Sequence, residues 1–367
     1  MTRKDDVSRR PVSVLLAETV KDGIAGMAPA NSAMVMSTGI VAIAMHNTGL
    51  HLPANAIAVL CFLLWTGNSA LLLARIAMAP RMVWKDCTNH GRSPGFLTLV
   101  AGTNVLGSCC VLVLDNTFAA ELLFGIGLVV WPGLLTLVIF ALIAGADKMP
   151  LETGINGAWL LMTVSTQSIV VLGSLLADPA QHPASVLGMV MLFLLGCALY
   201  FMVMPVILYR LFFKQLTPTA LNATFWIIAG AMAITCLAGN KLAPLLVASP
   251  ELAELLPIVR TFSIGGWALA TFWLPCLLLL GVWRHAIKKH PFTYGVEYWS
   301  MVFPLGMYTV CTQAIHEWFP VFPLTIPAYI GLAAAVTAWG LVFASFCMFL
   351  SGITRRAFVR GSGATHK

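Results

Sequence analysis

Residues 96–144 read FLTLVAGTNVLGSCCVLVLDNTFAAELLFGIGLVVWPGLLTLVIFALIA, and this stretch decides the fold. Residues 96–114 form an apolar span that carries Gly102-Thr103-Asn104, and a more apolar span follows over residues 118–144. An α-helix needs about twenty apolar residues to cross a bilayer, and each span comes close to that length or exceeds it. The stretch therefore predicts a hairpin of two membrane-spanning helices.

The same pair of spans occurs five times, at intervals of roughly seventy residues, which is typical of an internal repeat. The first span of each copy carries small, hydroxyl-bearing or amide residues in hydrophobic surroundings. They are Ser37, Thr38, Gly39, Gly102, Thr103, Asn104, Ser165, Thr166, Gln167, Gly230, Thr235, Gly306 and Thr309. Three of the second spans carry a proline between similar, mainly apolar neighbours, at Pro132, Pro205 and Pro275. Two independent sets of landmarks thus indicate one repeating hairpin.

The composition excludes a soluble domain. Hydrophobic residues make up 59% of the 367 residues, charged residues only 10%, and the mean hydropathy is +0.89. Too little polar surface exists to cover so much apolar volume in water. The apolar runs lack the period-two alternation of barrel strands. We therefore expect an all-α membrane protein.

The expected spans number ten. They cover residues 29–46, 54–78, 96–114, 118–144, 155–177, 184–212, 221–240, 256–283, 299–315 and 324–350. Of the 21 Lys and Arg residues, only Lys241 and Arg260 fall in connections on one side of the membrane. Because basic residues collect in cytoplasmic loops, both termini are expected to be cytoplasmic.

The expected organisation has three parts. Residues 1–26 form a cytoplasmic N-terminal segment, in which Val12, Leu15, Leu16 and Val20 suggest a short interfacial helix. Residues 27–353 form the ten-helix transmembrane channel domain, and residues 354–367 form a basic, disordered cytoplasmic tail.

Hairpins that start and end on the same side must run parallel, so the copies are related by an axis along the membrane normal. We expect a quasi-five-fold ring around a central pore, with the more polar first helix of each hairpin inside. The thirteen small and polar residues named above then line the pore, because hydroxyls and amides in hydrocarbon seek a partner helix or a wet cavity. For the glycines, close helix packing is the open alternative. Kinks are expected at Pro132, Pro205, Pro275 and Pro304.

No Asp, Glu, Lys or Arg lies near the middle of any expected span. Ion-coupled carriers commonly keep a carboxylate there, whereas passive anion conduction needs only weak sites. Lys241 and Arg260 are expected to attract anions to the outer mouth, with snorkelling or pairing to Glu251 or Glu254 as the alternative. The sequence therefore favours an anion channel or facilitator over a proton-coupled exporter.

The sequence contains no motif typical of an enzyme. The best cluster, His285, His290 and Glu297, matches no metal-ligand spacing, and the cysteines show no C-x-x-C pair. The basic residues lie in loops rather than in a patch with interleaved aromatics, which argues against nucleic-acid binding. We expect no catalysis, no metal and no cofactor.

Two stretches resemble a known family. Residues 33–41, AMVMSTGIV, and residues 298–308, YWSMVFPLGMY, are similar to the first and ninth helices of the tellurite-resistance/dicarboxylate transporter family. That family includes slow-type anion channels of plant guard cells, a bacterial tellurite-resistance channel homologue, malate permeases and sulfite exporters. The resemblance implies a ten-helix protomer with a pore through each subunit, a homotrimer, and a place in the bacterial inner membrane.

The resemblance also implies a gate. In channel members a phenylalanine of the ninth helix plugs the pore, and the motif aligns it with Phe303, although a phenylalanine that packs between helices is the alternative. The implied substrates are small inorganic anions or C4-dicarboxylates. A proton-coupled dicarboxylate, sulfite or tellurite-related exporter remains the runner-up.

Overall fold

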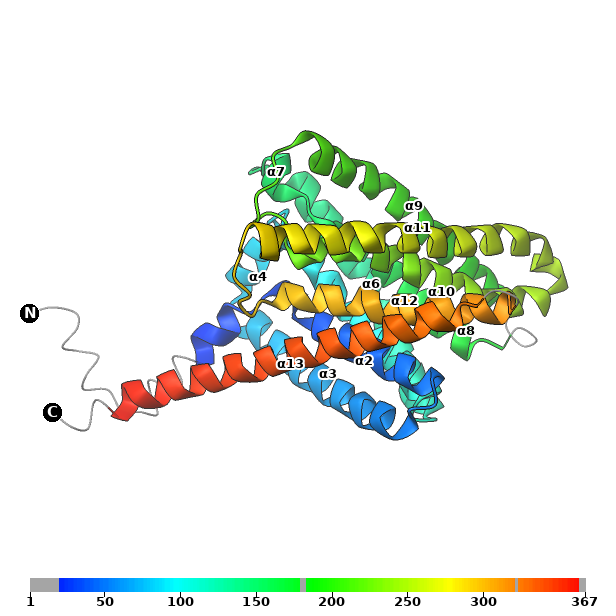
Figure 1. Cartoon of the computed structure of the whole chain (residues 1–367), viewed down its shortest axis with the longest axis horizontal. Coiled ribbons are helices and arrows are strands. Elements are labelled where there is room, and N and C mark those ends of the chain that lie inside the picture. The colour runs from blue at the N-terminus through cyan, green and yellow to red at the C-terminus, as the bar shows by residue number, and fades with distance from the viewer. Residues whose placement is uncertain (1–19, 179–182, 321–322, 363–367) are drawn as a thin grey trace, which may run out of the picture.

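The computed structural model describes residues 20–178, 183–320 and 323–362. Every regular element within these ranges is a helix, and the long helices run alongside one another (Figure 1). Eight helices of the described residues are long and apolar enough to cross a membrane. The protein is therefore an all-helical membrane protein.

Five successive units share one plan, in which a short 3-10 turn leads into a first helix and a longer second helix follows. The units are η2(Pro29–Ser32), α2(Ala33–Asn47) and α3(His51–Met78); η3(Ser93–Leu97), α5(Thr98–Leu112) and α6(Thr117–Ala144); η4(Gly157–Leu160), α8(Leu161–Leu176) and α9(Pro183–Phe213); η5(Ala223–Trp226), α10(Ile227–Val247) and α11(Leu256–Val282); η8(Val296–Tyr298), α12(Trp299–Trp318) and α13(Thr325–Ser362). The connections hold α4(Pro80–Cys87), α7(Leu151–Gly154), η6(Pro250–Leu255) and the π-helical turn η7(Trp283–Ile287).

We call the first helices of the units (α2, α5, α8, α10 and α12) the inner set, and the second helices (α3, α6, α9, α11 and α13) the outer set. Within the inner set, α2 packs on α5, α5 on α8, α8 on α10, α10 on α12, and α12 again on α2. The preceding turns η2, η3, η4, η5 and η8 contact one another in the same cyclic order. All five inner helices therefore begin at one end of the molecule.

Burial separates the two sets. The apolar windows of α5, α8 and α10, taken with their 3-10 turns, are 83%, 83% and 94% buried. The corresponding windows of α3, α6, α9, α11 and α13 are 17–44% buried. The outer set leaves large apolar side chains exposed, such as Phe118 and Met202, as expected of helices that face lipid.

Two of the ten expected spans, α2 and α12, are not among the eight. The α2 helix has only 15 residues, fewer than the ~20 that a spanning helix needs. The α12 helix has 20 residues, but its last six include Gln313, His316 and Glu317. For these two helices a full crossing stays a prediction.

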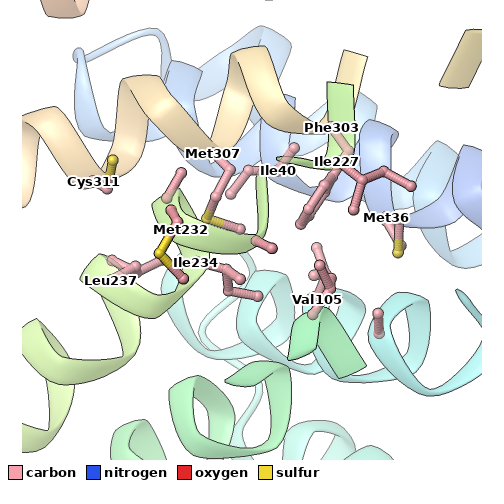
Figure 2. Packing of buried hydrophobic residues seen from close by; sticks show 14 of the residues in the cluster. Met36, Ile40, Val105, Ile227, Met232, Ile234, Leu237, Phe303, Met307 and Cys311 are labelled. Carbon is pink, nitrogen blue, oxygen red and sulfur yellow. The ribbon is translucent and has the colours of Figure 1, made fainter. Parts of the chain in front are cut away.

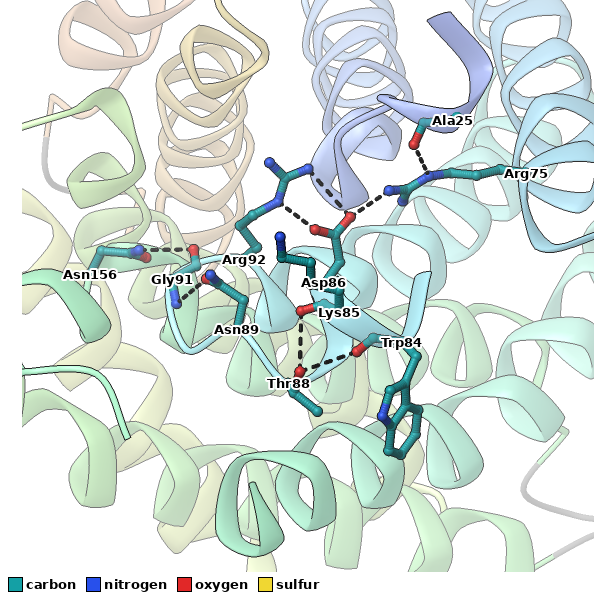
Figure 3. Close-up of polar contacts among 10 residues, drawn as sticks. All are labelled: Ala25, Arg75, Trp84, Lys85, Asp86, Thr88, Asn89, Gly91, Arg92 and Asn156. Atoms are coloured by element: carbon teal, nitrogen blue, oxygen red, sulfur yellow. Dashed lines mark hydrogen bonds and ion pairs between the residues drawn. The ribbon is translucent and has the colours of Figure 1, made fainter. Parts of the chain in front are cut away.

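The end at which the inner helices begin is held together by polar contacts, and we call it the basic end (Figure 3). The buried Arg75 donates to Asp86 at 2.5 Å, and Arg92 pairs with the same carboxylate at 2.8 Å. The amide of Asn156, before η4, donates to the Gly91 carbonyl, before η3, at 3.1 Å. These contacts join the connections that follow α3 and α6.

Two boundaries differ from the expectation. The α13 helix continues to Ser362. Residues 354–362 are therefore helical, whereas a disordered tail was predicted there. The helical run from residue 343 to residue 362 contains no proline, which is compatible with its continuation. Of the predicted interfacial helix, Val12, Leu15 and Leu16 lie outside the described residues, and residues 20–25 are helical.

The expected kink positions all lie inside helices. Pro132, Pro205, Pro275 and Pro304 are internal to α6, α9, α11 and α12, and each helix continues past its proline. Pro244 is internal to α10 in the same way.

Candidate functional site: a cavity between the inner helices

A cavity of about 190 Å³ lies between the five inner helices, and each of them contributes to its wall. The lining residues follow a common register of i, i+3 and i+7, the spacing of one helix face. Nearest the basic end the wall is formed by Ile40, Val105, Ser168, Ile234 and Met307. The next layer is formed by Ile43, Ser108, Val171, Leu237 and Val310. The rim is formed by Asn47, Leu112, Leu175, Lys241, Gln313, Ala314 and Glu317.

The wall of the cavity is apolar except for two serines. The Ser108 hydroxyl donates to the Asn104 carbonyl at 3.0 Å. The Ser168 hydroxyl donates to the Ser165 carbonyl at 2.7 Å and accepts from the Asn104 amide at 3.0 Å. Both hydroxyl protons are thus engaged by the backbone, so the wall can bind an anion only weakly.

The rim carries the charge. Lys241 of α10 and Glu317 of α12 both line it, and the Asn47 amide donates to the Gln313 side-chain oxygen at 3.1 Å. Arg260, the other expected anion attractor, is exposed on α11 with its guanidinium 5.7 Å from the centre of the Trp318 ring. The structure therefore brings Lys241 to the cavity but not Arg260.

Phe303 lies between the cavity and the basic end. It precedes Met307 by one helical turn on α12, toward the basic end, and its side chain is 0% exposed. Its ring packs close to Gly230 of α10, where an added Cβ would stand 3.5 Å from the Phe303 Cδ1. Figure 2 shows Phe303 within the buried cluster that also holds Met36, Ile40 and Ile227.

None of the thirteen residues expected to line the pore lines this cavity. Three of the threonines instead accept hydrogen bonds from tryptophans of the outer set. The indole nitrogens of Trp339, Trp65 and Trp131 donate to the hydroxyls of Thr38, Thr103 and Thr166 at 3.1, 2.9 and 3.0 Å. In hydrocarbon each of these groups needs a partner, and the pairs satisfy both.

The sequence analysis missed a fourth such pair. The Trp267 indole of α11 donates to the Thr312 hydroxyl of α12 at 3.0 Å. A tryptophan in an outer span together with a threonine at similar depth in the next inner span was the available signal. These four pairs fasten the inner helices to the outer helices.

The other predicted polar residues also contact protein. Ser37 donates to the Trp299 carbonyl at 2.7 Å, and Gln167 donates to the Phe193 carbonyl at 3.0 Å. Ser165, Thr235 and Thr309 donate to carbonyls of their own helices. A role of these residues in pore lining stays a prediction, and their placement favours helix packing.

The predicted glycines lie at close helix contacts. An added Cβ at Gly39 would stand 2.7 Å from Val105 of α5, and one at Gly306 would stand 2.8 Å from Ile40 of α2. At Gly102 it would stand 3.1 Å from the Ser32 carbonyl. Small residues here let the inner helices approach one another.

In the cluster of His285, His290 and Glu297, the two histidines contact each other and a neighbouring aromatic ring. The His285 Nδ1 donates to the His290 carbonyl at 2.9 Å, and its ring stacks on Phe292. Across the described ranges, no three His, Cys, Asp or Glu side chains come together as a metal site would require.

Comparison with known proteins gives a family and several relatives. The family model described as voltage-dependent anion channel matches residues 26–347. The uncharacterized transporters MJ0762 and MJ0576 of Methanocaldococcus jannaschii are each 24% identical, over 82% and 86% of this chain and 86% and 90% of their own lengths. The uncharacterized membrane protein MT1776 of Mycobacterium tuberculosis is 35% identical over 30% of this chain, and the match spans 56% of that protein.

The family and the transporter relatives point to transport rather than catalysis. The match to the family model extends from the residues just before η2 to the second half of α13, and so includes every helix that lines the cavity. The chain belongs to the voltage-dependent anion channel family.

Proposed function

We propose that the protein is a channel for small monovalent anions, which pass through the cavity between the inner helices and are held back by Phe303. The observation that carries the proposal is the register of the wall. Five helices each present one face to the same cavity, and the cavity stops one turn from a fully buried aromatic side chain. Protein interiors are normally close-packed, so an open space lined by all five inner helices is unusual for a region that serves only as a core.

The electrostatics favour anions that carry one charge. All five inner helices start at the basic end, so the positive ends of five helix dipoles face that mouth. Lys241 is the only Lys or Arg among the described residues of the cavity wall, and Glu317 shares the rim with it. An apolar wall that offers no further charge strongly disfavours a dianion, because desolvating a second charge is costly. C4-dicarboxylates are therefore the less favoured cargo.

Phe303 serves as the gate in this proposal. An aromatic ring in a narrow apolar waist blocks ions by bulk and by excluding water. A change of rotamer or a small shift of α12 would move the ring away from Gly230 and join the cavity to the basic end.

The runner-up is a proton-coupled exporter of dicarboxylate, sulfite or tellurite-related anions. Coupling needs a titratable group where substrate and proton meet. Among the described lining residues the only titratable ones are Lys241 and Glu317, and both stand at the rim. The barrier at Phe303 has no such group in its layer of the wall, which favours passive conduction.

The family resemblance supplies the remaining parts of the proposal. The ten helices form a quasi-five-fold ring that spans the bacterial inner membrane, three such subunits form a homotrimer, and the basic end faces the cytoplasm. The cyclic contacts of the inner set and the positive-inside rule support the ring and the orientation.

Anion flux into proteoliposomes tests the function. Wild type, Phe303→Ala and the control Phe193→Ala are compared with chloride, nitrate, sulfite and malate, with and without an imposed pH gradient. Phe193 is equally buried but packs against Gly239, away from the cavity, so both variants carry a similar stability cost of about 3–5 kcal/mol. We expect a gain in monovalent anion flux of about tenfold or more in Phe303→Ala alone, independent of pH. Saturable flux that follows the proton gradient in all three proteins would establish the carrier instead.

A further inference from the structure

A second cavity, separate from the pore, opens between two outer helices near the basic end. Its volume is about 750 Å³, and its walls come from the last turns of α11 with the turn η7, the middle of α13, the turn η5 with the residues just before it, and the start of α12. The walls are mainly apolar, with Leu278 of α11 and Leu341 of α13 both exposed. We call this cavity the lateral groove.

The groove exists because α13 presents small side chains to it. Ala333, Ala334 and Ala338 line one side, and Gly281 lies on the α11 side. The stretch of α11 and η7 that lines the groove from Leu277 to Arg284 covers about 10 Å along a helix axis. Half of a bilayer's hydrocarbon core is ~15 Å thick, so the groove reaches through much of one leaflet.

One buried arginine stands at the polar end of the groove. Arg284 lines the groove, is 6% exposed, and lies in the π-helical turn that ends α11. Its Nε has no acceptor, and within the described ranges no carboxylate pairs with its guanidinium. A buried cation without a partner is costly, and an anion bound beside the guanidinium would offset that cost.

We propose that the lateral groove binds an anionic phospholipid, with the headgroup phosphate on Arg284 and an acyl chain between α11 and α13. Arg284 matches the charged headgroup of such a lipid, and the apolar walls match its acyl chain. A soluble anion could neutralise the guanidinium, but it has no apolar part to fill the space between the walls. A phospholipid of the adjacent leaflet covers the walls and neutralises the guanidinium together.

A second copy of this chain fits less well. It would have to cover the groove with an outer helix, and among those five helices only α6 contains a carboxylate, Glu121 in its second turn. That turn lies at the end of α6 away from the basic end, so no outer helix can bring a negative charge to Arg284. Charge complementarity thus selects the lipid.

Native mass spectrometry of the delipidated full-length protein tests the proposal, with phosphatidylglycerol and phosphatidylcholine of identical acyl chains as probes. Arg284→Gln removes the charge and Ala334→Phe fills the groove. The matched controls are Arg260→Gln, an exposed arginine at the other end of α11, and Ala344→Phe, an exposed alanine of α13 that does not line the groove.

We expect retention of phosphatidylglycerol to fall about tenfold in Arg284→Gln, with its preference over phosphatidylcholine lost, while Arg284→Lys retains part of the preference. Ala334→Phe should lower retention of both lipids, and both controls should behave as wild type. Unchanged retention in Arg284→Gln and Ala334→Phe would overturn the proposal. Displacement of the lipid by inorganic phosphate alone would point to a soluble anion site, and conversion of an oligomer to monomers by Ala334→Phe would point to a second copy.

Discussion

The two faces of the inner helices differ in a way that the sequence conceals. Between the rim and the basic end, the face toward the cavity is apolar apart from Ser108 and Ser168. The opposite face carries Thr38, Thr103 and Thr166, each bonded to a tryptophan of an outer helix. Polar groups in these helices therefore serve mainly to attach one helix to another. In the proposed channel, the surface that the ion meets is weakly polar, which suits passage better than binding.

Blocking the cavity face of the inner helices should have the largest effect on anion flux. Ser108→Phe places a large ring in a cavity of about 190 Å³, so it should lower anion flux of the Phe303→Ala protein about tenfold or more. Thr66→Phe, on the exposed side of α3, is the control and should leave the flux unchanged. Measuring proteoliposome flux of both double variants checks this, and equal flux would show that ions avoid the cavity.

The opposite face should respond in stability and not in flux. Thr103→Val removes the acceptor of the Trp65 indole and should lower the free energy of unfolding by about 1 kcal/mol, since such bonds within membranes average ~0.6 kcal/mol and an orphaned donor adds a penalty. A double-mutant cycle with Trp65→Phe, followed by thermal unfolding in detergent, measures the coupling. If Thr103→Val instead changed the order of anion selectivity, the assignment of the two faces would be reversed.

The smallest effect is expected at the rim. Lys241→Gln should lower inward chloride flux two- to threefold at low ionic strength, and this difference should vanish at high salt, because screening weakens the attraction of anions to an exposed mouth. Arg260→Gln, whose side chain lies over Trp318 and off the cavity, provides the comparison. An equal loss in both variants would mean that the rim acts through its total charge and not through Lys241.

The sequence predicted an all-helical membrane protein because the hydropathy of a segment depends only on the residues that it contains. Membrane-spanning length and the absence of central charges needed no knowledge of packing. The 3-10 turns that start each inner helix were missed, since they differ in composition from PANS in η2 to VEY in η8.

The orientation of the hydroxyls could not be predicted from one helix at a time. Thr103 and Ser108 are both polar and five residues apart, yet one faces Trp65 of α3 and the other faces the cavity. Only the partner decides which side a hydroxyl takes, and the partner lies on another helix. Arg284 illustrates the same limit, because a basic residue just after an expected span gives no sign in the sequence that its side chain is buried beside the lateral groove.

The central claim is that the Phe303 side chain alone separates the cavity from the basic end. The most direct measurement is unitary current across a planar bilayer for wild type, Phe303→Leu and Phe303→Ala under symmetric chloride. The account predicts that wild type is closed, Phe303→Leu conducts weakly and Phe303→Ala conducts steadily, in the order of decreasing side-chain volume. A folded Phe303→Ala protein that passes no current would contradict it, and Phe303 would then be a packing residue of the core.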